Sequence, residues 1–279
     1  MRYGVILTGV GAMADPERLC RAARKADQLG FHSLWLFEHV AFPTRISEAY
    51  EKLPFSHETA FLEPITTLSY IAAETRQIRL GTGILLLALR HPLHVAKAVA
   101  TLDVLSKGRA ICGVGLGWLA EEFEALGIPF RERVGRVREG VEVLRKIWAG
   151  GKLAHQGRYY SFPEVTSYPL PIQRGGPPIW FGGTADSALK RAVELGDGWL
   201  GVSGRPEVVH HWITTLRQRA QELGKDNFSI AVSVKPDASK EEIAHLETMG
   251  AAQVNLFFLP GESEEIERKL EAAAKRLFD

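Results

Sequence analysis

The sequence has few cysteines and no long apolar run, and both shortages limit its possible classes. Its two cysteines, Cys20 and Cys112, are too few for a disulfide scaffold or a zinc cluster, and they suit a reducing cytoplasm. No apolar run approaches the roughly 20 residues that a membrane helix needs. The apolar stretch near the N-terminus is short and broken by Gly9 and Gly11. We therefore expect a first strand there rather than a signal peptide.

An excess of charge of one sign is also missing. The chain has 34 Lys and Arg against 33 Asp and Glu, which gives a formal net charge of +1. Such a balance provides no field that would attract nucleic acid or an anionic membrane. We therefore expect neither as a partner, and we expect the chemistry to come from local sites.

The motifs of several enzyme classes are absent as well. The sequence has no P-loop, no Gly-x-Ser-x-Gly elbow, and no His-x-x-x-His spacing with a third ligand. It therefore predicts no metal site.

What the sequence does contain is a regular alternation of short apolar runs and helical patterns. After the first run, Asp15-Pro16 provides an N-cap and a first helical residue, and Gly30 ends the helix. The pattern predicts eight strands, at residues 3–7, 33–37, 78–86, 110–114, 179–181, 199–202, 228–234 and 253–259. Eight strands that are each followed by a helix predict an α/β protein with the (β/α)8 or TIM-barrel fold. The 279 residues suit one such domain, 1–279.

The rival architecture is an open, doubly wound sheet. That fold often carries a glycine fingerprint after its first strand, whereas here Gly9-Val10-Gly11 is followed by Ala12-Met13-Ala14. Two segments are too long for ordinary loops, namely residues 40–63 after the second strand and residues 150–176 after the fourth. We interpret both as insertions in the barrel, and the first as a lid or insertion.

In a barrel of this kind the functional site lies at the C-terminal ends of the strands. The clearest motif there is Gly182-Gly183-Thr184, which follows a strand and opens a helix. Free backbone amides and the helix dipole attract a phosphate at such a place. Thr184 either caps the helix or donates to a phosphate oxygen, and a plain tight turn is the alternative. Asp186 would repel a phosphate if it pointed inward.

Glu38-His39, at the end of the second strand, is the best candidate for acid–base catalysis. An imidazole exchanges protons near neutral pH. The alternative is a structural histidine that is hydrogen-bonded under the following loop. Glu38 either orients His39 or faces solvent. We interpret His91, before a later helix, as a capping or packing residue.

Other strand ends carry residues that suit a flat ligand. Glycines let the backbone approach such a ligand closely. A tryptophan there either packs on the ligand or is a core residue. These further candidates are Thr8 after the first strand, Gly83 after the third, and Gly115, Gly117 and Trp118 after the fourth.

Taken together, these motifs resemble the bacterial luciferase-like monooxygenase family. The resemblance covers residues 1–200 closely and the rest of the chain loosely. The motifs that carry it are Leu80-Gly81-Thr82-Gly83-Ile84, His91-Pro92, Lys97, the run from Thr101 to Arg109, Gly113-Val114-Gly115-Leu116-Gly117-Trp118 with Glu121 or Glu122 behind it, the run from Pro177 to Thr184, and the run from Ala192 to Trp199.

The resemblance implies a (β/α)8 barrel that binds FMN or the deazaflavin coenzyme F420, and the short chain is most similar to the F420-dependent branch. It implies that the cofactor ring lies over a bulge with a cis peptide at Gly83–Ile84, and that the tail phosphate lies near residues 182–184. The implied reaction passes a hydride between the cofactor and a small organic substrate, and His39 moves the accompanying proton. A homodimer is also implied.

The sequence departs from the family's pattern at three places. Relatives carry an Asp-His pair where this chain has Glu38-His39. Some have a glutamate where this chain has Leu116 or Gly117, and several have a tryptophan where it offers Phe42.

Three alternatives stay open at this point. One is an FMN-dependent monooxygenase on the same fold, and another is a non-catalytic protein that binds a flavin or deazaflavin. The third, an aldolase or isomerase barrel, would need a catalytic lysine at a strand end, where only Lys235 qualifies.

Overall fold

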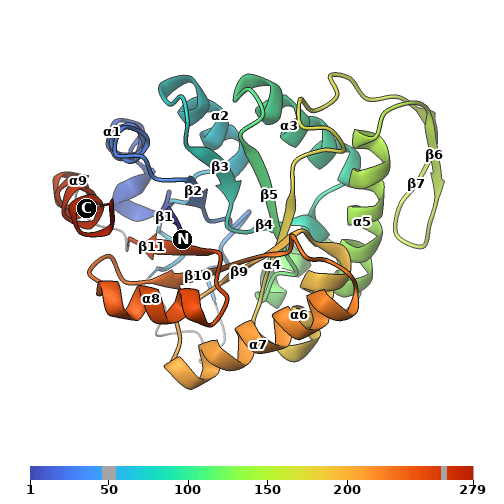
Figure 1. The fold of residues 1–279 in the computed structure, drawn as a ribbon. Coiled ribbons are helices and arrows are strands. Elements are labelled where there is room, and N and C mark those ends of the chain that lie inside the picture. Colours follow the sequence, from blue (N-terminus) through green and yellow to red (C-terminus); the bar gives the residue numbers. More distant parts are fainter. Residues whose placement is uncertain (46–54, 259–262, 279) are drawn as a thin grey trace.

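The computed structural model describes residues 1–45, 55–258 and 263–278. At its centre, parallel strands follow one another in the order β3-β2-β1-β11-β10-β9-β8-β5, and the pairing of β3 with β5 closes the barrel (Figure 1). The fold class predicted from the sequence is confirmed. The barrel strands are β1 (Arg2–Thr8), β2 (Ser33–Leu36), β3 (Arg79–Thr82), β5 (Ala110–Gly115), β8 (Ile179–Gly182), β9 (Gly198–Gly201), β10 (Ser229–Val234) and β11 (Gln253–Phe257).

The third predicted strand is interrupted rather than continuous. β3 ends at Thr82, and the short strand β4 (Leu85–Leu86) continues the pairing along β5. Between them the Gly83–Ile84 peptide bond is cis, as the family resemblance implied. The prediction of one strand over 78–86 is therefore wrong at this bulge. Leu259, the predicted end of the eighth strand, lies outside the described residues.

Helices surround the strands on the outside of the barrel (Figure 1). None of those in the described part of the chain is long and apolar enough to cross a membrane. The helices are α1 (Pro16–Gln28), α2 (Pro64–Glu74), α3 (Pro92–Leu105), α4 (Ala120–Ala125), α5 (Arg133–Trp148), α6 (Asp186–Leu195), α7 (Pro206–Glu222), α8 (Lys240–Thr248) and α9 (Ser263–Phe278).

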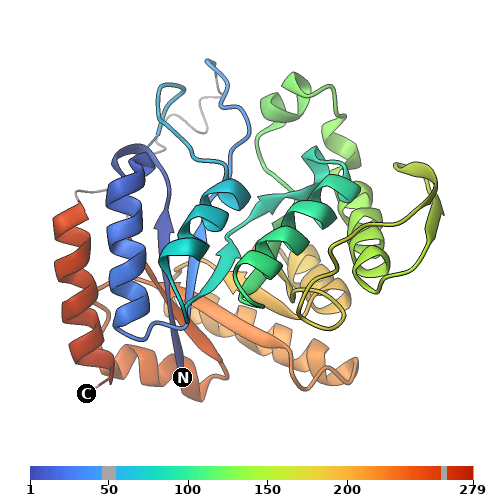
Figure 2. The ribbon, with the colours of Figure 1, turned by 90° about the horizontal axis from the view of Figure 1, so that it is seen from above.

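The two long segments that the sequence marked as insertions lie at different places. The described parts of residues 40–63 rise beside α4 at one end of the barrel (Figure 2). Phe61 in this segment forms an isolated antiparallel bridge with Val10. Residues 150–176 contain an antiparallel hairpin of β6 (Leu153–Gln156) and β7 (Ser161–Val165), which extends outward beside α5 (Figure 1).

Helix starts follow the capping residues in the sequence. Asp15 caps α1, because its Oδ1 accepts a hydrogen bond from the Arg18 N–H at 2.9 Å. Ser239 caps α8 in the same way through the Glu242 N–H at 3.1 Å. His91 caps α3, with Nδ1 accepting from the Leu93 N–H at 3.3 Å.

The interior of the barrel is filled by a small apolar cluster. Trp35 is fully buried there, and its ring centroid lies 5.2 Å from that of Trp180. A Cβ at Gly81 would lie 2.3 Å from Trp35 Cε3. Gly81 therefore makes room for a core side chain rather than for a ligand. The buried members of this cluster are Ile6, Trp35, Ile111, Trp180, Leu200 and Ala231.

We expect the free energy of unfolding to fall at acidic pH because of His32. This residue directly precedes β2, at the N-terminal end of the barrel. Burial, with smaller contributions from Arg2 and Arg79, lowers the pKa of His32 to about 4. The unfolded chain then binds more protons than the folded one, so stability is lost as the pH falls from about 6.5 towards 4. For this half-buried group we expect a loss of about 1–2 kcal/mol after solvent screening.

The check is urea unfolding of the wild type and of His32→Gln at pH 7.5 and pH 5. The variant should lose less stability between the two pH values than the wild type does. His210→Gln, at an exposed position of α7, is the control and should behave like the wild type. An equal loss in His32→Gln and the wild type would contradict the assignment.

Candidate active site

A cavity of about 190 Å³ lies at the C-terminal ends of the barrel strands; we call it the mouth cavity. Phe37 and Phe257 form part of its wall and stack with their ring centroids 5.6 Å apart. Four of the predicted cofactor-binding residues line it together, namely Gly83, Ile84, Gly182 and Gly183. The other residues around it are Ile6, Leu200, Gly201, Val202, Ser203 and Ser233.

The side chain of Ile84 fits between two glycines at this mouth. A Cβ at Gly115 would lie 1.7 Å from Ile84 Cδ1, and one at Gly182 would lie 3.1 Å from the same atom. Gly115 therefore shapes the cavity indirectly, by making room for Ile84. Gly117 has a positive φ of 81°, and a Cβ there would lie 2.7 Å from Phe123 Cε2. Direct contact of Gly115 or Gly117 with a cofactor stays a prediction.

A row of free backbone amides begins beyond β8 at Gly183, which lines the mouth cavity. The helix that follows, α6, begins at Asp186 with Ala185 as its N-cap and with no side-chain cap. The prediction that Thr184 caps this helix is therefore wrong. The N–H groups of residues 183–187 donate no hydrogen bond to any residue that the structure describes. This arrangement, at a helix N-terminus, can bind an anion.

The carboxylate of Asp186 is held on the side of α7. Its Oδ1 lies 3.4 Å from Nε2 of His211, and both side chains are exposed. This contact directs the carboxylate towards α7.

The partner of His39 is a carboxylate distant in sequence. Nδ1 of His39 lies 3.1 Å from Oε2 of Glu122, in the first turn of α4. The other oxygen, Oε1, accepts the N–H groups of Val40 at 2.5 Å and Ala41 at 3.1 Å. The side chain of Glu122 is 1% exposed. Sequence reasoning noted Glu122 only as part of a family motif and missed this contact.

Glu38 turns away from His39. Its carboxylate accepts hydrogen bonds from Nη2 of Arg90 and from the N–H of Leu86, just after the bulge. Arg90 also reaches Oε1 of Glu63, the N-cap of α2, at 3.0 Å. Burial raises the pKa of Glu38, and the Arg90 charge opposes the rise. Both sequence interpretations of Glu38, as the partner of His39 or as a solvent-exposed residue, are wrong; its catalytic assignment stays a prediction.

Aromatic rings surround His39 on several sides. The ring centroids of Phe42, Phe55, Phe61 and Trp118 lie between 5.1 and 6.3 Å from that of His39. Trp118 is 37% exposed, so it is not a core residue. Among the described residues His39 does not line the mouth cavity itself, and it follows Phe37, which does, by two positions. His39 thus lies at the rim.

Thr8 is the remaining residue that the sequence predicts to contact a cofactor. It is 2% exposed, has a positive φ of 57°, and its hydroxyl has no hydrogen-bond partner among the described residues. Its carbonyl accepts the N–H of Phe37 at 3.1 Å, which ties β1 to the wall of the mouth. Binding of a cofactor by Thr8 stays a prediction.

No group of three or more metal-ligand side chains occurs within residues 1–45, 55–258 and 263–278.

Known proteins that are similar to this chain include both F420-dependent and flavin-dependent enzymes. The family model described as luciferase-like monooxygenase matches residues 1–277. The F420-dependent glucose-6-phosphate dehydrogenase of Kineococcus radiotolerans is 32% identical over 195 residues, which are 68% of this chain and 53% of that protein. The oxygenase component of the flavin-dependent trigonelline monooxygenase of Acinetobacter baylyi is 30% identical over 182 residues, 64% of this chain and 46% of that protein.

More than one solved structure matches this chain over nearly its full length, and one of them is a monooxygenase. The crystal structure of the monooxygenase RslO1 from Streptomyces bottropensis has a TM-score of 0.85 and 25% identity, covering 100% of this chain and 99% of that chain.

The fit of Ile84 predicts a steric conflict in Gly115→Ala. We expect this change to cost about 1–3 kcal/mol of unfolding free energy, because the new methyl group overlaps Ile84 Cδ1. In an Ile84→Ala background the same change should cost about 0.5 kcal/mol or less, since the overlapping atom is gone. Urea unfolding of the four proteins of this cycle measures both values. Equal costs in the two backgrounds would show that Ile84 is not the neighbour that matters.

A second prediction follows from the burial of the Glu122 carboxylate. In Glu122→Gln an amide replaces a carboxylate whose two oxygens contact His39, Val40 and Ala41, and the new NH2 group cannot accept a hydrogen bond as the oxygen that it replaces can. We expect a loss of about 1–3 kcal/mol in urea unfolding. We also expect faster protease cleavage within residues 40–63, which the carboxylate anchors at Val40 and Ala41. Glu124→Gln, exposed on the same helix, should match the wild type in both assays; a similar loss there would remove the argument.

Proposed function

The chain belongs to the luciferase-like monooxygenase family, and from this premise we propose that it is an oxidoreductase that transfers a hydride between coenzyme F420 and a small organic substrate. The observation that carries the proposal is the mouth cavity together with the row of free amides beside it. Glycine backbone and apolar side chains are a suitable lining for one face of a planar ring. An anionic tail fits amides at a helix N-terminus.

The residues present therefore fit a cofactor of the kind that the family uses. Gly83, Ile84 and Gly182 would hold the ring, and the amides of residues 183–187 would hold the phosphate of the tail. When bound, the cofactor supplies the redox centre, and the protein supplies position and electrostatics.

His39 is the group that we propose for proton transfer. Glu122 contacts Nδ1, which leaves Nε2 as the ring nitrogen available to a substrate. Among the described residues no hydrogen bond to Nε2 is formed. Glu122 is then a positioning residue, and the rings of Phe42, Phe61 and Trp118 keep water from the imidazole.

The choice of F420 over FMN rests on the family resemblance of the short chain and on the Kineococcus relative. An FMN-dependent monooxygenase is the second candidate, and two observations favour it. The Acinetobacter relative is a flavin-dependent monooxygenase of nearly equal identity, and one of the structures that match over nearly the full length is that of a monooxygenase.

Titration of the apoprotein with F420 and with FMN tests the proposal. We expect F420 to bind more tightly, as measured by the change in cofactor fluorescence. Gly183→Ala should weaken the binding of either cofactor by about tenfold, because the amide row needs the positive φ of 101° at this glycine. Gly127→Ala, at a φ of 67° with no atom within 4 Å, is the matched control for backbone strain alone.

The outcomes separate the candidates. Tighter binding of FMN would favour the monooxygenase. If neither cofactor binds, the proposed function is wrong. If Gly183→Ala binds as the wild type does, the amide row is not the anion site.

A further inference from the structure

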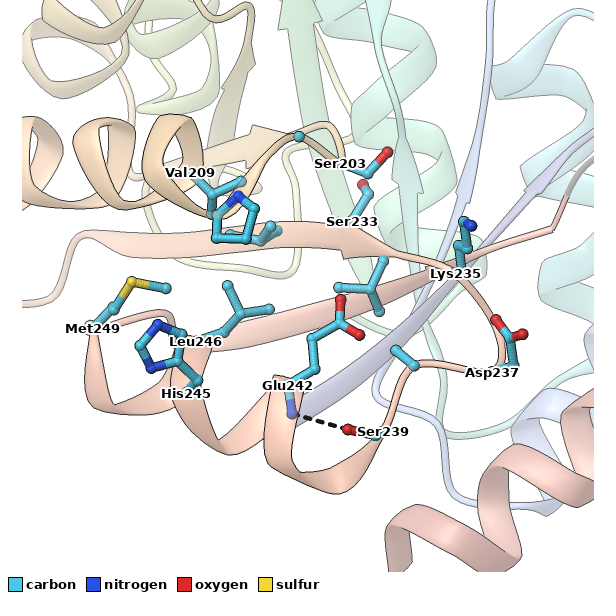
Figure 3. A pocket seen from close by; sticks show the side chains of 15 residues that line it. Ser203, Val209, Ser233, Lys235, Asp237, Ser239, Glu242, His245, Leu246 and Met249 are labelled. Carbon is cyan, nitrogen blue, oxygen red and sulfur yellow. Dashed lines mark hydrogen bonds between the residues drawn. The ribbon is translucent and has the colours of Figure 1, made fainter.

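A second cavity, of about 520 Å³, lies between α7 and α8 against β10; we call it the side cavity (Figure 3). Its size falls within the usual range for small-molecule sites, roughly 300–1,000 Å³. Its walls are mainly apolar, and they include Val209 from α7, Val232 and Val234 from β10, and Leu246 and Met249 from α8.

The side cavity and the mouth cavity share a wall. Ser203, after β9, and Ser233, on β10, line both of them. A ligand in the side cavity can therefore place one end beside the mouth while its body lies between the two helices.

The polar groups at this shared end are mostly hydrogen-bond acceptors. The hydroxyl of Ser233 donates to the carbonyl of Gly201 at 2.6 Å, so its oxygen is left as an acceptor. The carboxylate of Glu242 points from α8 into the cavity (Figure 3). The hydrogen bond between Glu242 and Ser239 involves the backbone N–H of Glu242 and not its carboxylate. Asp237 adds a second carboxylate.

Lys235 also lines the side cavity. It lies at the end opposite to Met249, beyond Glu242 (Figure 3). Lys235, Asp237 and Glu242 form no ion pair with a residue of the described ranges. All three residues are exposed. Two carboxylates against one lysine leave an excess of one negative charge among them, which favours a cation at this end of the cavity.

We propose that the side cavity binds a primary ammonium ion carried on an apolar alkyl or arylalkyl body. An ammonium group has three donors and no acceptor, which matches the free oxygen of Ser233 and the carboxylate of Glu242. The apolar body lies against Val209, Leu246 and Met249, where it leaves water. This site lies beside the mouth and does not depend on which cofactor the mouth binds.

Methyl NMR of the methionines tests the site directly. The chain has three methionines, Met1, Met13 and Met249. Met249 lines the side cavity, whereas Met13 is fully buried elsewhere. In protein labelled with ¹³C at the methionine methyl groups, hexylammonium should shift the Met249 signal to saturation and leave the other two unchanged.

Two probes with the same six-carbon tail measure the choice of head group. Hexan-1-ol and hexanoate should also be titrated, and hexylammonium should bind roughly tenfold more tightly than hexan-1-ol, with hexanoate weakest. Glu242→Gln should remove most of this advantage. Glu241→Gln, on the same turn of α8 and outside the lining, should keep it.

The proposal fails if no probe shifts the NMR signal of Met249. It also fails if hexylammonium binds no more tightly than hexan-1-ol or hexanoate, or if Glu242→Gln still binds hexylammonium more tightly than the other two probes. Cofactor titration of the same samples reports on the mouth separately. A protein that binds no cofactor but shows the Met249 response would overturn the proposed function and leave this inference standing.

Discussion

The shape of the barrel mouth depends on a steric fit around one side chain, Ile84. Its Cδ1 occupies the space that a Cβ at Gly115 would need, and Gly182 leaves room on the other side. Both glycines are the last residues of barrel strands, so this fit is set by the sheet and not by loop packing. Ile84 in turn lines the cavity. The bulge after β3, the end of β5 and the end of β8 therefore act together as one wall.

Two buried carboxylates connect the rim to this wall. Glu38 joins the end of β2 to the N–H of Leu86 and to Arg90, and Glu122 joins α4 to His39 and to the segment after it. Glu38 accepts one backbone N–H group and Glu122 accepts two, each in addition to a side-chain contact, and a buried charge needs such partners. As a consequence, the imidazole of His39 is positioned by a residue 83 positions away, while the adjacent Glu38 supports the bulge.

The sequence predicted the barrel because strands and helices alternate in it with clear periods, and it predicted the capping of α1 because the signal at Asp15 is local. It also placed Gly83 and Gly182 at one site, since parallel strands of a barrel end at the same face. It did not predict the contact between His39 and Glu122, because no local pattern shows which distant carboxylate folds back onto a given imidazole. The start of α6 was misplaced at Thr184, because no side chain caps that helix.

The mouth cavity and the side cavity adjoin where β9 and β10 meet. On this side the wall between the mouth cavity and the side cavity includes Ser203 and Ser233, and the Ser233 hydroxyl ties the two strands together through the carbonyl of Gly201. Ile84 and the stacked pair of Phe37 and Phe257 form other parts of the mouth wall. Ligands in the two cavities would therefore contact the same two serines. The shared serines, after β9 and on β10, therefore provide a direct route for coupling between the two ligands.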